Sequence, residues 1–164
     1  MPDAGMASFQ MSRQRRIILA CEKWWPLLGP NNLPNRSDCS GFVRSVAKEL
    51  GLPLTGQAND IYLQIQQAPW SVLGRGNAAA HLAAVAATNG KFVIGAWRNP
   101  SGGNGHVAVV VDTNYSSTTP PFHLRALAYW GTLGLEGKKR QVHSLSWGPD
   151  KQQEVLYAAV DIDV

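Results

Sequence analysis

Cysteine and histidine are the side chains with the clearest chemical potential in this chain. Its 164 residues include two cysteines, Cys21 and Cys39, and four histidines. Cys39 stands in the stretch Ser-Asp-Cys-Ser-Gly-Phe, directly before a run of residues with helical apolar spacing. A cysteine that only packs is expected inside an apolar stripe, as Cys21 is, whereas a cysteine at the mouth of a helix is placed to react.

The position of Cys39 favours a nucleophile. Unpaired backbone N–H groups and the positive end of the helix dipole meet at the first turn of a helix. Both stabilise a thiolate, so the sequence predicts a lowered pKa for Cys39. The same N–H groups would serve as an oxyanion hole, and Gly41 is expected to let a substrate approach the turn.

A thiolate nucleophile needs a partner that accepts and returns its proton, and histidine titrates near neutral pH. His81 falls in an alanine-rich predicted helix, His123 follows two prolines, and His143 lies in a polar hairpin region. His106 differs because it opens a strongly apolar predicted strand, directly after a glycine-rich loop. From there it can project over a helix start docked on the sheet, so we predict Cys39 and His106 as nucleophile and base.

The signatures of other chemistries are missing from the sequence. The cysteines and histidines lack the two-to-four-residue spacing of zinc ligands, so no metal and no cofactor is expected. The glycines of Pro-Ser-Gly-Gly-Asn-Gly precede neither a helix nor a Lys-Ser/Thr pair, and they predict no phosphate-binding loop. No Gly-x-Ser-x-Gly marks a serine nucleophile.

Hydrophobic spacing predicts the elements that would position the pair. Helices are expected over 12–25, 39–50, 59–67 and 77–90, and strands over 91–97, 106–112, 122–130 and 154–162. Ser12 and either Ser37 or Asp38 are expected to cap the first two helices, and Asp112 to end a strand in a turn. Helices followed by strands indicate an α+β fold, with N-terminal helices packed on a mostly antiparallel sheet. Residues 1–11 are expected to be disordered and 12–164 to form a single domain.

Composition limits the partners of this chain. The formal net charge is +4 and 45% of the residues are hydrophobic. The basic clusters at 13–16 and 138–140 are short and lack interleaved stacking aromatics, so no nucleic-acid partner is expected. No apolar run approaches the length of a membrane span, and Ile17–Cys21 is too short for the apolar core of a signal peptide. We expect synthesis in the cytoplasm without a signal peptide, no membrane insertion, and both cysteines reduced.

With these residues in view, the chain resembles the NlpC-type branch of papain-like cysteine peptidases. Within that branch it is most similar to the first family of peptidoglycan amidase effectors delivered by type VI secretion. The likeness covers roughly residues 17–160. It rests on Pro34-Asn35 before DCSGFV, on GQAN at 56–59, on GHVAVV at 105–110, and on Tyr-Trp-Gly at 129–131. DCSGF together with GHVAVV is a specific pair.

The resemblance implies a papain-like fold with Cys39 as nucleophile and His106 as general base. It implies hydrolysis of the amide between the γ-carboxyl of D-glutamate and meso-diaminopimelate in peptidoglycan stem peptides. The implied partners are the stem peptide, a cognate immunity protein and the type VI secretion machinery. The implied place of action is the periplasm of a target bacterium.

The third catalytic element departs from the pattern of many NlpC-type enzymes, which use a polar residue on the next strand to orient the histidine. That strand reads RALAYW here. In the effector subgroup Trp130 matches the position, and it would act through its backbone carbonyl. Asp112 lies six residues from His106, roughly 20 Å along a strand, and is too distant to orient it.

Substrate contacts are expected around the nucleophile and its base. Ser37, Asp38 and Ser40 would meet charged groups of the stem peptide, with helix capping as the alternative role of Ser37 and Asp38. Gly105, in the loop before His106, would line one wall of the cleft. Two other functions remain open: a housekeeping cell-wall hydrolase of the same fold, and a papain-like shell kept as a binding module with Cys39 structural.

Overall fold

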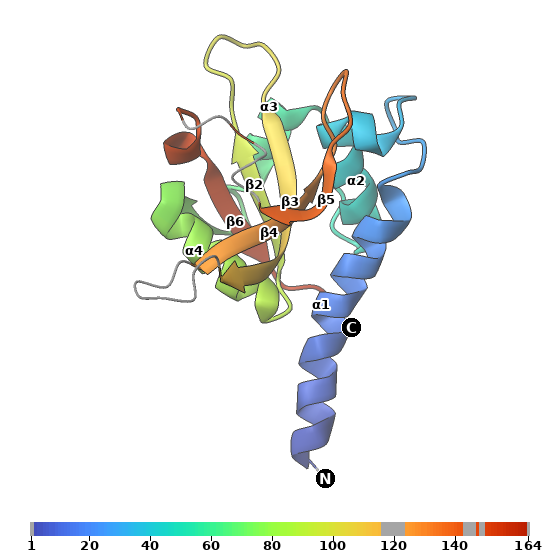
Figure 1. Ribbon diagram of the computed structural model, residues 1–164, viewed down its shortest axis with the longest axis vertical. Helices are drawn as coiled ribbons and strands as arrows, with labels where there is room; N and C mark the ends of the chain where they lie inside the picture. The colour runs from blue at the N-terminus through green and yellow to red at the C-terminus, as the bar shows by residue number, and fades with distance from the viewer. Residues whose placement is uncertain (1, 116–123, 143–146, 148–149, 164) are drawn as a thin grey trace.

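The computed structural model of the chain describes residues 2–115, 124–142, 147 and 150–163. It is an α+β fold in which a six-stranded antiparallel sheet has helices on both faces (Figure 1). The predicted α+β class is confirmed, and the arrangement is compatible with a papain-like fold. The helices are α1 (Pro2–Trp24), α2 (Cys39–Glu49), α3 (Ala58–Gln64) and α4 (Gly76–Thr88), with short 3-10 turns η1 (Asn35–Ser37) and η3 (Gln152–Glu154). The strands are β1 (Ser71–Arg75), β2 (Phe92–Trp97), β3 (His106–Tyr115), β4 (Leu124–Trp130), β5 (Lys138–Val142) and β6 (Leu156–Val160).

The sheet follows the strand order β1-β6-β2-β3-β4-β5, and every pairing is antiparallel. The apolar run that begins at His106 forms an interior strand, as predicted. The two strands that the sequence did not predict, β1 and β5, are the two edges of the sheet. Both are largely exposed, and β5 reads Lys-Lys-Arg-Gln-Val. Charged residues on an edge hinder pairing with another chain, and they also remove the alternating pattern that reveals a strand.

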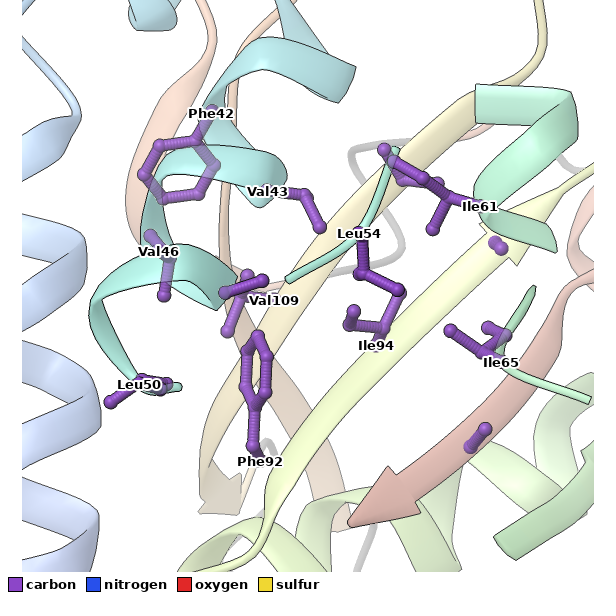
Figure 2. Packing of buried hydrophobic residues seen from close by; sticks show 14 of the residues in the cluster. Phe42, Val43, Val46, Leu50, Leu54, Ile61, Ile65, Phe92, Ile94 and Val109 are labelled. Carbon is purple, nitrogen blue, oxygen red and sulfur yellow. The ribbon is translucent and has the colours of Figure 1, made fainter. Parts of the chain in front are cut away.

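Successive side chains of the interior strands point to opposite faces of the sheet, so the buried residues form one cluster on each face. On β3, Val107, Val109 and Val111 join the cluster under α1, α2 and α3, whereas Ala108 and Val110 join the cluster under α4. Figure 2 shows the first cluster, in which Phe42, Val43 and Val46 of α2, with Leu50 directly after the helix, face residues of β2 and β3. This packing fixes α2, and with it Cys39, against the sheet.

Helix α1 begins ten residues before the predicted start. It runs from Pro2, so Ser12 is inside the helix and does not cap it. Figure 1 shows the amino-terminal half of α1 extending away from the sheet, while its second half packs on the core through residues such as Ile17 and Cys21. The Arg16 guanidinium donates to the backbone carbonyl of Asp163, so the segment that follows β6 is bound to this helix. That residues 1–11 are disordered in solution stays a prediction.

Asp112 does not end β3, contrary to the prediction. The strand continues to Tyr115, with an irregularity in its pairing to β4 between Val110 and Asp112. The carboxylate pairs with the Arg140 guanidinium on β5. An irregularity of this kind turns a side chain out of the regular pleat, so a charged residue is tolerated inside the strand.

Candidate active site

Cys39 lies at one end of the sheet, where α2 begins and β4 stops. We call this the site end of the sheet: β2 ends there at Trp97, β3 begins at His106, and β4 ends at Trp130. A Cβ added to Gly131 would overlap the backbone oxygen of Asn35. The chain that enters α2 therefore packs directly against the residue that follows β4.

The Cys39 sulfur lies against the backbone of β3. Its side chain is 8% exposed, and it accepts hydrogen bonds from the backbone N–H groups of Val107 and Ser40. Val107 directly follows His106, so the structure brings the predicted nucleophile next to the predicted base.

Burial raises the pKa of the Cys39 thiol to about 11. The Asp38 carboxylate adds to this rise, while the backbone N–H groups around the sulfur oppose it. The predicted lowering of this pKa is wrong for the free protein, because removal from water outweighs the hydrogen bonds and partial charge at the helix start. Cys39 is therefore a protonated thiol at neutral pH.

His106 is half-buried at the start of β3. Its ring meets the Trp147 ring edge to face, with centroids 4.9 Å apart. Its cross-strand partner is Trp97, and the Lys151 ammonium lies 4.4 Å from the centre of the Trp97 ring. Burial lowers the pKa of His106 to about 4, and the charge of Lys151 contributes. The imidazole is therefore neutral at pH 7 and able to accept a proton.

The other histidines do not join this site within the part of the chain that the structure describes. His81 is exposed on α4, and α4 packs on the face of the sheet opposite α2. His123 and His143 lie outside the described residues.

Asp38 and Ser40, predicted to bind substrate, are 4% and 2% exposed and brace the start of α2. The Ser40 hydroxyl donates to Gln57 Oε1 at 2.7 Å and lies 3.2 Å from Asp38 Oδ1. Asn31 Nδ2 donates to Asp38 Oδ2 at 2.8 Å. Asp38 occupies the N-cap position, yet its side chain makes no capping hydrogen bond. Direct contact of Asp38 and Ser40 with substrate stays a prediction.

Gly41 has a different role from the one predicted. A Cβ at this position would overlap Oδ2 of Asp38, so glycine makes room for the buried carboxylate. The space over the turn is thus filled by the protein's own side chain. Ser37 is half-buried in η1, and its contact with substrate also stays a prediction.

The glycine-rich loop between β2 and β3 rests on α3 through Asn59. Asn59 Oδ1 accepts a hydrogen bond from the Asn99 backbone N–H at 3.0 Å, and Asn59 Nδ2 donates to the Gly103 carbonyl at 3.0 Å. A Cβ at Gly105 would lie 2.5 Å from Asn59 Oδ1 and 2.5 Å from the Trp97 carbonyl oxygen. Gly105 therefore permits a close approach of the loop to α3, and its contact with substrate stays a prediction.

The Trp130 carbonyl accepts a hydrogen bond from Trp25 Nε1 at 3.0 Å. A Cβ at Gly137 would overlap the same oxygen, which places it between the end of α1 and the approach to β5. The oxygen is thus engaged by Trp25, directly after α1, and its role in orienting His106 stays a prediction.

A cavity of about 300 Å³ lies beside Trp97 at the site end of the sheet. Its lining residues are Tyr62, Arg75, Arg98, Pro100, Gln153 and Glu154. Arg98 follows Trp97, and Glu154 Oε2 accepts the Trp97 indole N–H at 2.9 Å. A larger cavity of about 580 Å³ runs along the outer side of α2 and includes neither Cys39 nor His106.

The described residues contain neither a cluster of metal ligands nor a membrane-spanning helix. There, no three His, Cys, Asp or Glu side chains gather closely enough to hold a metal ion. Every helix in the same part of the chain is too short or too polar to cross a bilayer.

Four residues of this site were not predicted as functional. Gln57 and Asn59 belong to the GQAN stretch, whose presence was noted in the resemblance without a role for its side chains. Trp147 and Lys151 lie more than 40 positions from His106 in sequence, and no local pattern marks them. Only the fold brings them to the site.

Comparison with known proteins agrees with this chemistry. No protein-family model matches the chain. A curated protein, Peptidoglycan amidase Tse1 of Pseudomonas aeruginosa, is 40% identical over 96 residues. The matched stretch covers 58% of this chain and 58% of that relative. The chain is therefore similar, over more than half of its length, to a peptidoglycan amidase, which supports the resemblance carried by its motifs.

Proposed function

We propose that this chain is a cysteine amidase that hydrolyses peptidoglycan stem peptides at the bond between γ-D-glutamate and meso-diaminopimelate. The observation that carries the proposal is the juxtaposition of the Cys39 sulfur with the backbone that follows His106. The similarity to a peptidoglycan amidase supports the substrate, and the resemblance of the motifs supports the particular bond.

Both reacting groups are neutral in the free protein, so general-base attack is the route that we infer. Cys39 adds to the γ-carbonyl carbon of D-glutamate while His106 takes the thiol proton. Backbone N–H groups at the start of α2 stabilise the oxyanion. His106 then gives the proton to the departing diaminopimelate amine as the C–N bond breaks. Water, deprotonated by His106, releases D-glutamate from the thioester and restores the thiol.

The cavity beside Trp97 offers a place for the carboxylates of a stem peptide. Arg75 and Arg98 line it, and neither forms an ion pair among the described residues. Arg98 directly follows β2, the strand next to β3, which is roughly 5 Å away at ordinary strand spacing. The two stem residues on either side of the scissile bond span about 7 Å when extended, so a stem peptide anchored at Cys39 would reach Arg98.

Mass spectrometry of defined muropeptides tests this function. The wild-type protein, Cys39→Ala and Cys21→Ala would each be incubated with disaccharide tetrapeptide. We expect wild type and Cys21→Ala to release diaminopimelyl-alanine and Cys39→Ala to release nothing, because Cys21 is fully buried in α1. A Cys39-dependent cut at another bond would overturn the bond assignment. Unaltered muropeptides with folded, reduced wild type would overturn the function.

The biological role that we propose is that of an antibacterial effector. The protein would be delivered by type VI secretion into the periplasm of a target bacterium, and the producing cell would encode an immunity protein that blocks the cleft. Expression in a Gram-negative host with and without an added periplasmic signal tests this role. We expect lysis only with periplasmic export and intact Cys39. If the protein is active in vitro but its export to the periplasm does not harm the host, a housekeeping hydrolase would be favoured.

A further inference from the structure

We propose that Asn59 is a positioning residue, which holds His106 in register with Cys39 by anchoring the loop that leads into β3. The inference rests on the proposed function, since it concerns how the same pair is held. The effect of Asn59 on His106 passes through this loop.

One amide group of Asn59 bridges two separate points of the loop. Its oxygen accepts the Asn99 N–H, and its nitrogen donates to the Gly103 carbonyl, each at 3.0 Å. The loop also bonds to itself through the Asn99 side chain, which accepts the Ser101 N–H at 3.0 Å and donates to the Asn104 carbonyl at 3.2 Å. Asn59 therefore anchors to α3 a loop that also bonds to itself.

The anchor acts immediately before His106. Gly105 lies so close to Asn59 that an added Cβ would be 2.5 Å from its side-chain oxygen. Residues 101–104 are exposed, so core packing does not hold this part of the loop in place. The position of the first residue of β3 therefore depends on polar contacts with α3 as well as on its pairing with Trp97.

The same end of α3 also contacts the residue next to the nucleophile. Gln57 Oε1 accepts the hydroxyl hydrogen of Ser40, the residue after Cys39, at 2.7 Å. Asp60 Oδ2 accepts the Gln57 backbone N–H at 2.9 Å, which holds Gln57 at the helix start. Segment 57–59 thus has one contact beside Cys39 and one beside His106, and it adds to the helix packing and strand pairing that set their spacing.

Gln64 supplies a matched control on the same helix. Its amide also makes two backbone contacts with one loop, accepting the Thr55 N–H at 3.0 Å and donating to the Thr55 carbonyl at 2.7 Å. That loop does not lead into β3. Gln64 Oε1 also accepts from the Thr55 hydroxyl and Gln64 Nε2 also donates to the Asp60 carbonyl, so Gln64→Ala removes more hydrogen bonds than Asn59→Ala. Only Asn59→Ala frees the chain before His106.

Steady-state hydrolysis of a stem peptide tests the inference. We expect Asn59→Ala to lower kcat by about 10- to 100-fold, with KM changed by less than about threefold, because misplacing a catalytic group by about 1 Å is enough for such a loss. Gln64→Ala should leave kcat within about twofold of wild type, despite a loss of stability at least as large. Asn59→Asp keeps the acceptor for Asn99 and loses the donor to Gly103, so an intermediate kcat is expected. Equal effects of the Asn59 and Gln64 substitutions on kcat would overturn the proposal.

A readout independent of activity separates this inference from the proposed function. In ¹H–¹⁵N spectra, Asn59→Ala should shift or broaden the His106 ring resonances, and Gln64→Ala should leave them in place. An inactive wild type that shows this difference would overturn the function and keep the positioning role. If wild type is active and neither substitution changes the His106 resonances, the positioning role alone is overturned.

Discussion

The Cys39 sulfur accepts a hydrogen bond from the backbone N–H of Val107, one residue past His106. The contact joins the start of α2 to the start of β3, so helix packing and strand pairing together place the reactive groups. It also leaves the sulfur almost out of contact with water, and that burial governs its reactivity in the free protein.

We expect alkylation of Cys39 by iodoacetamide to be slow at pH 7. Because burial raises the pKa of this thiol to about 11, the thiolate fraction should grow about tenfold per pH unit as the pH rises toward that value. Peptide mass mapping over pH 6–10 measures the rate. Cys21, which is fully buried, should stay unmodified while the protein is folded. A Cys39 rate that is high and constant between pH 5 and 8 would instead indicate a thiolate–imidazolium pair.

Acid should destabilise the fold through His106. Burial lowers the folded-state pKa of His106 to about 4, below the unfolded value of about 6.5, so unfolding takes up a proton between these values. The stabilisation is full above pH 6.5 and is lost as the pH falls to 4. It is at most about 3 kcal/mol, and less because the ring is partly exposed.

Urea unfolding at pH 5 and pH 7.5 measures this dependence. His106→Gln should reduce the difference in unfolding free energy between the two pH values, since glutamine does not titrate. His81→Gln is the control, because His81 is exposed on α4. An unchanged pH dependence in His106→Gln would show that the imidazole is not desolvated in the folded state.

The interior of the fold was predictable because its residues carry periodic signals. The helical stripe from Phe42 to Leu50 and the apolar run from His106 gave α2 and β3. The edge strands were missed because β1 is short and contains Gly74, and β5 is charged. Pairing with a neighbour makes these segments strands, and a single-sequence pattern does not contain the neighbour.

The site was predictable in its residue types and not in its electrostatics. The start of a helix argued for a thiolate at Cys39, but the sequence does not show how deeply β3 would bury the sulfur. Likewise, Gly41 was predicted to leave space for substrate, whereas the Asp38 carboxylate fills the space beside it. Each of these depends on contacts between segments that are distant in the chain, which local spacing does not encode.

Gly131→Ala should damage the site through the backbone. The added Cβ would overlap the Asn35 carbonyl oxygen, which cannot rotate away as a side chain would. We expect a loss of about 1–3 kcal/mol in unfolding free energy, as for an overpacked core position, together with a lower kcat because the entry to α2 must move. Gly131→Ala with wild-type stability and kcat would show that this junction does not position Cys39.

Arg98→Gln should weaken substrate binding with little effect on the chemical step. Its guanidinium lines the cavity beside Trp97, so its loss removes a charge-assisted contact with a substrate carboxylate. Because Arg98 is exposed, we expect a KM about fivefold higher, equivalent to about 1 kcal/mol, at unchanged kcat. Arg125→Gln, an exposed arginine near the opposite end of β4, is the charge-matched control. Amidating the D-glutamate and diaminopimelate carboxylates one at a time should identify the carboxylate that contacts Arg98. On the substrate in which that carboxylate is amidated, wild type and Arg98→Gln should have the same KM. Equal KM values for wild type and Arg98→Gln on every substrate would exclude the cavity as the carboxylate site.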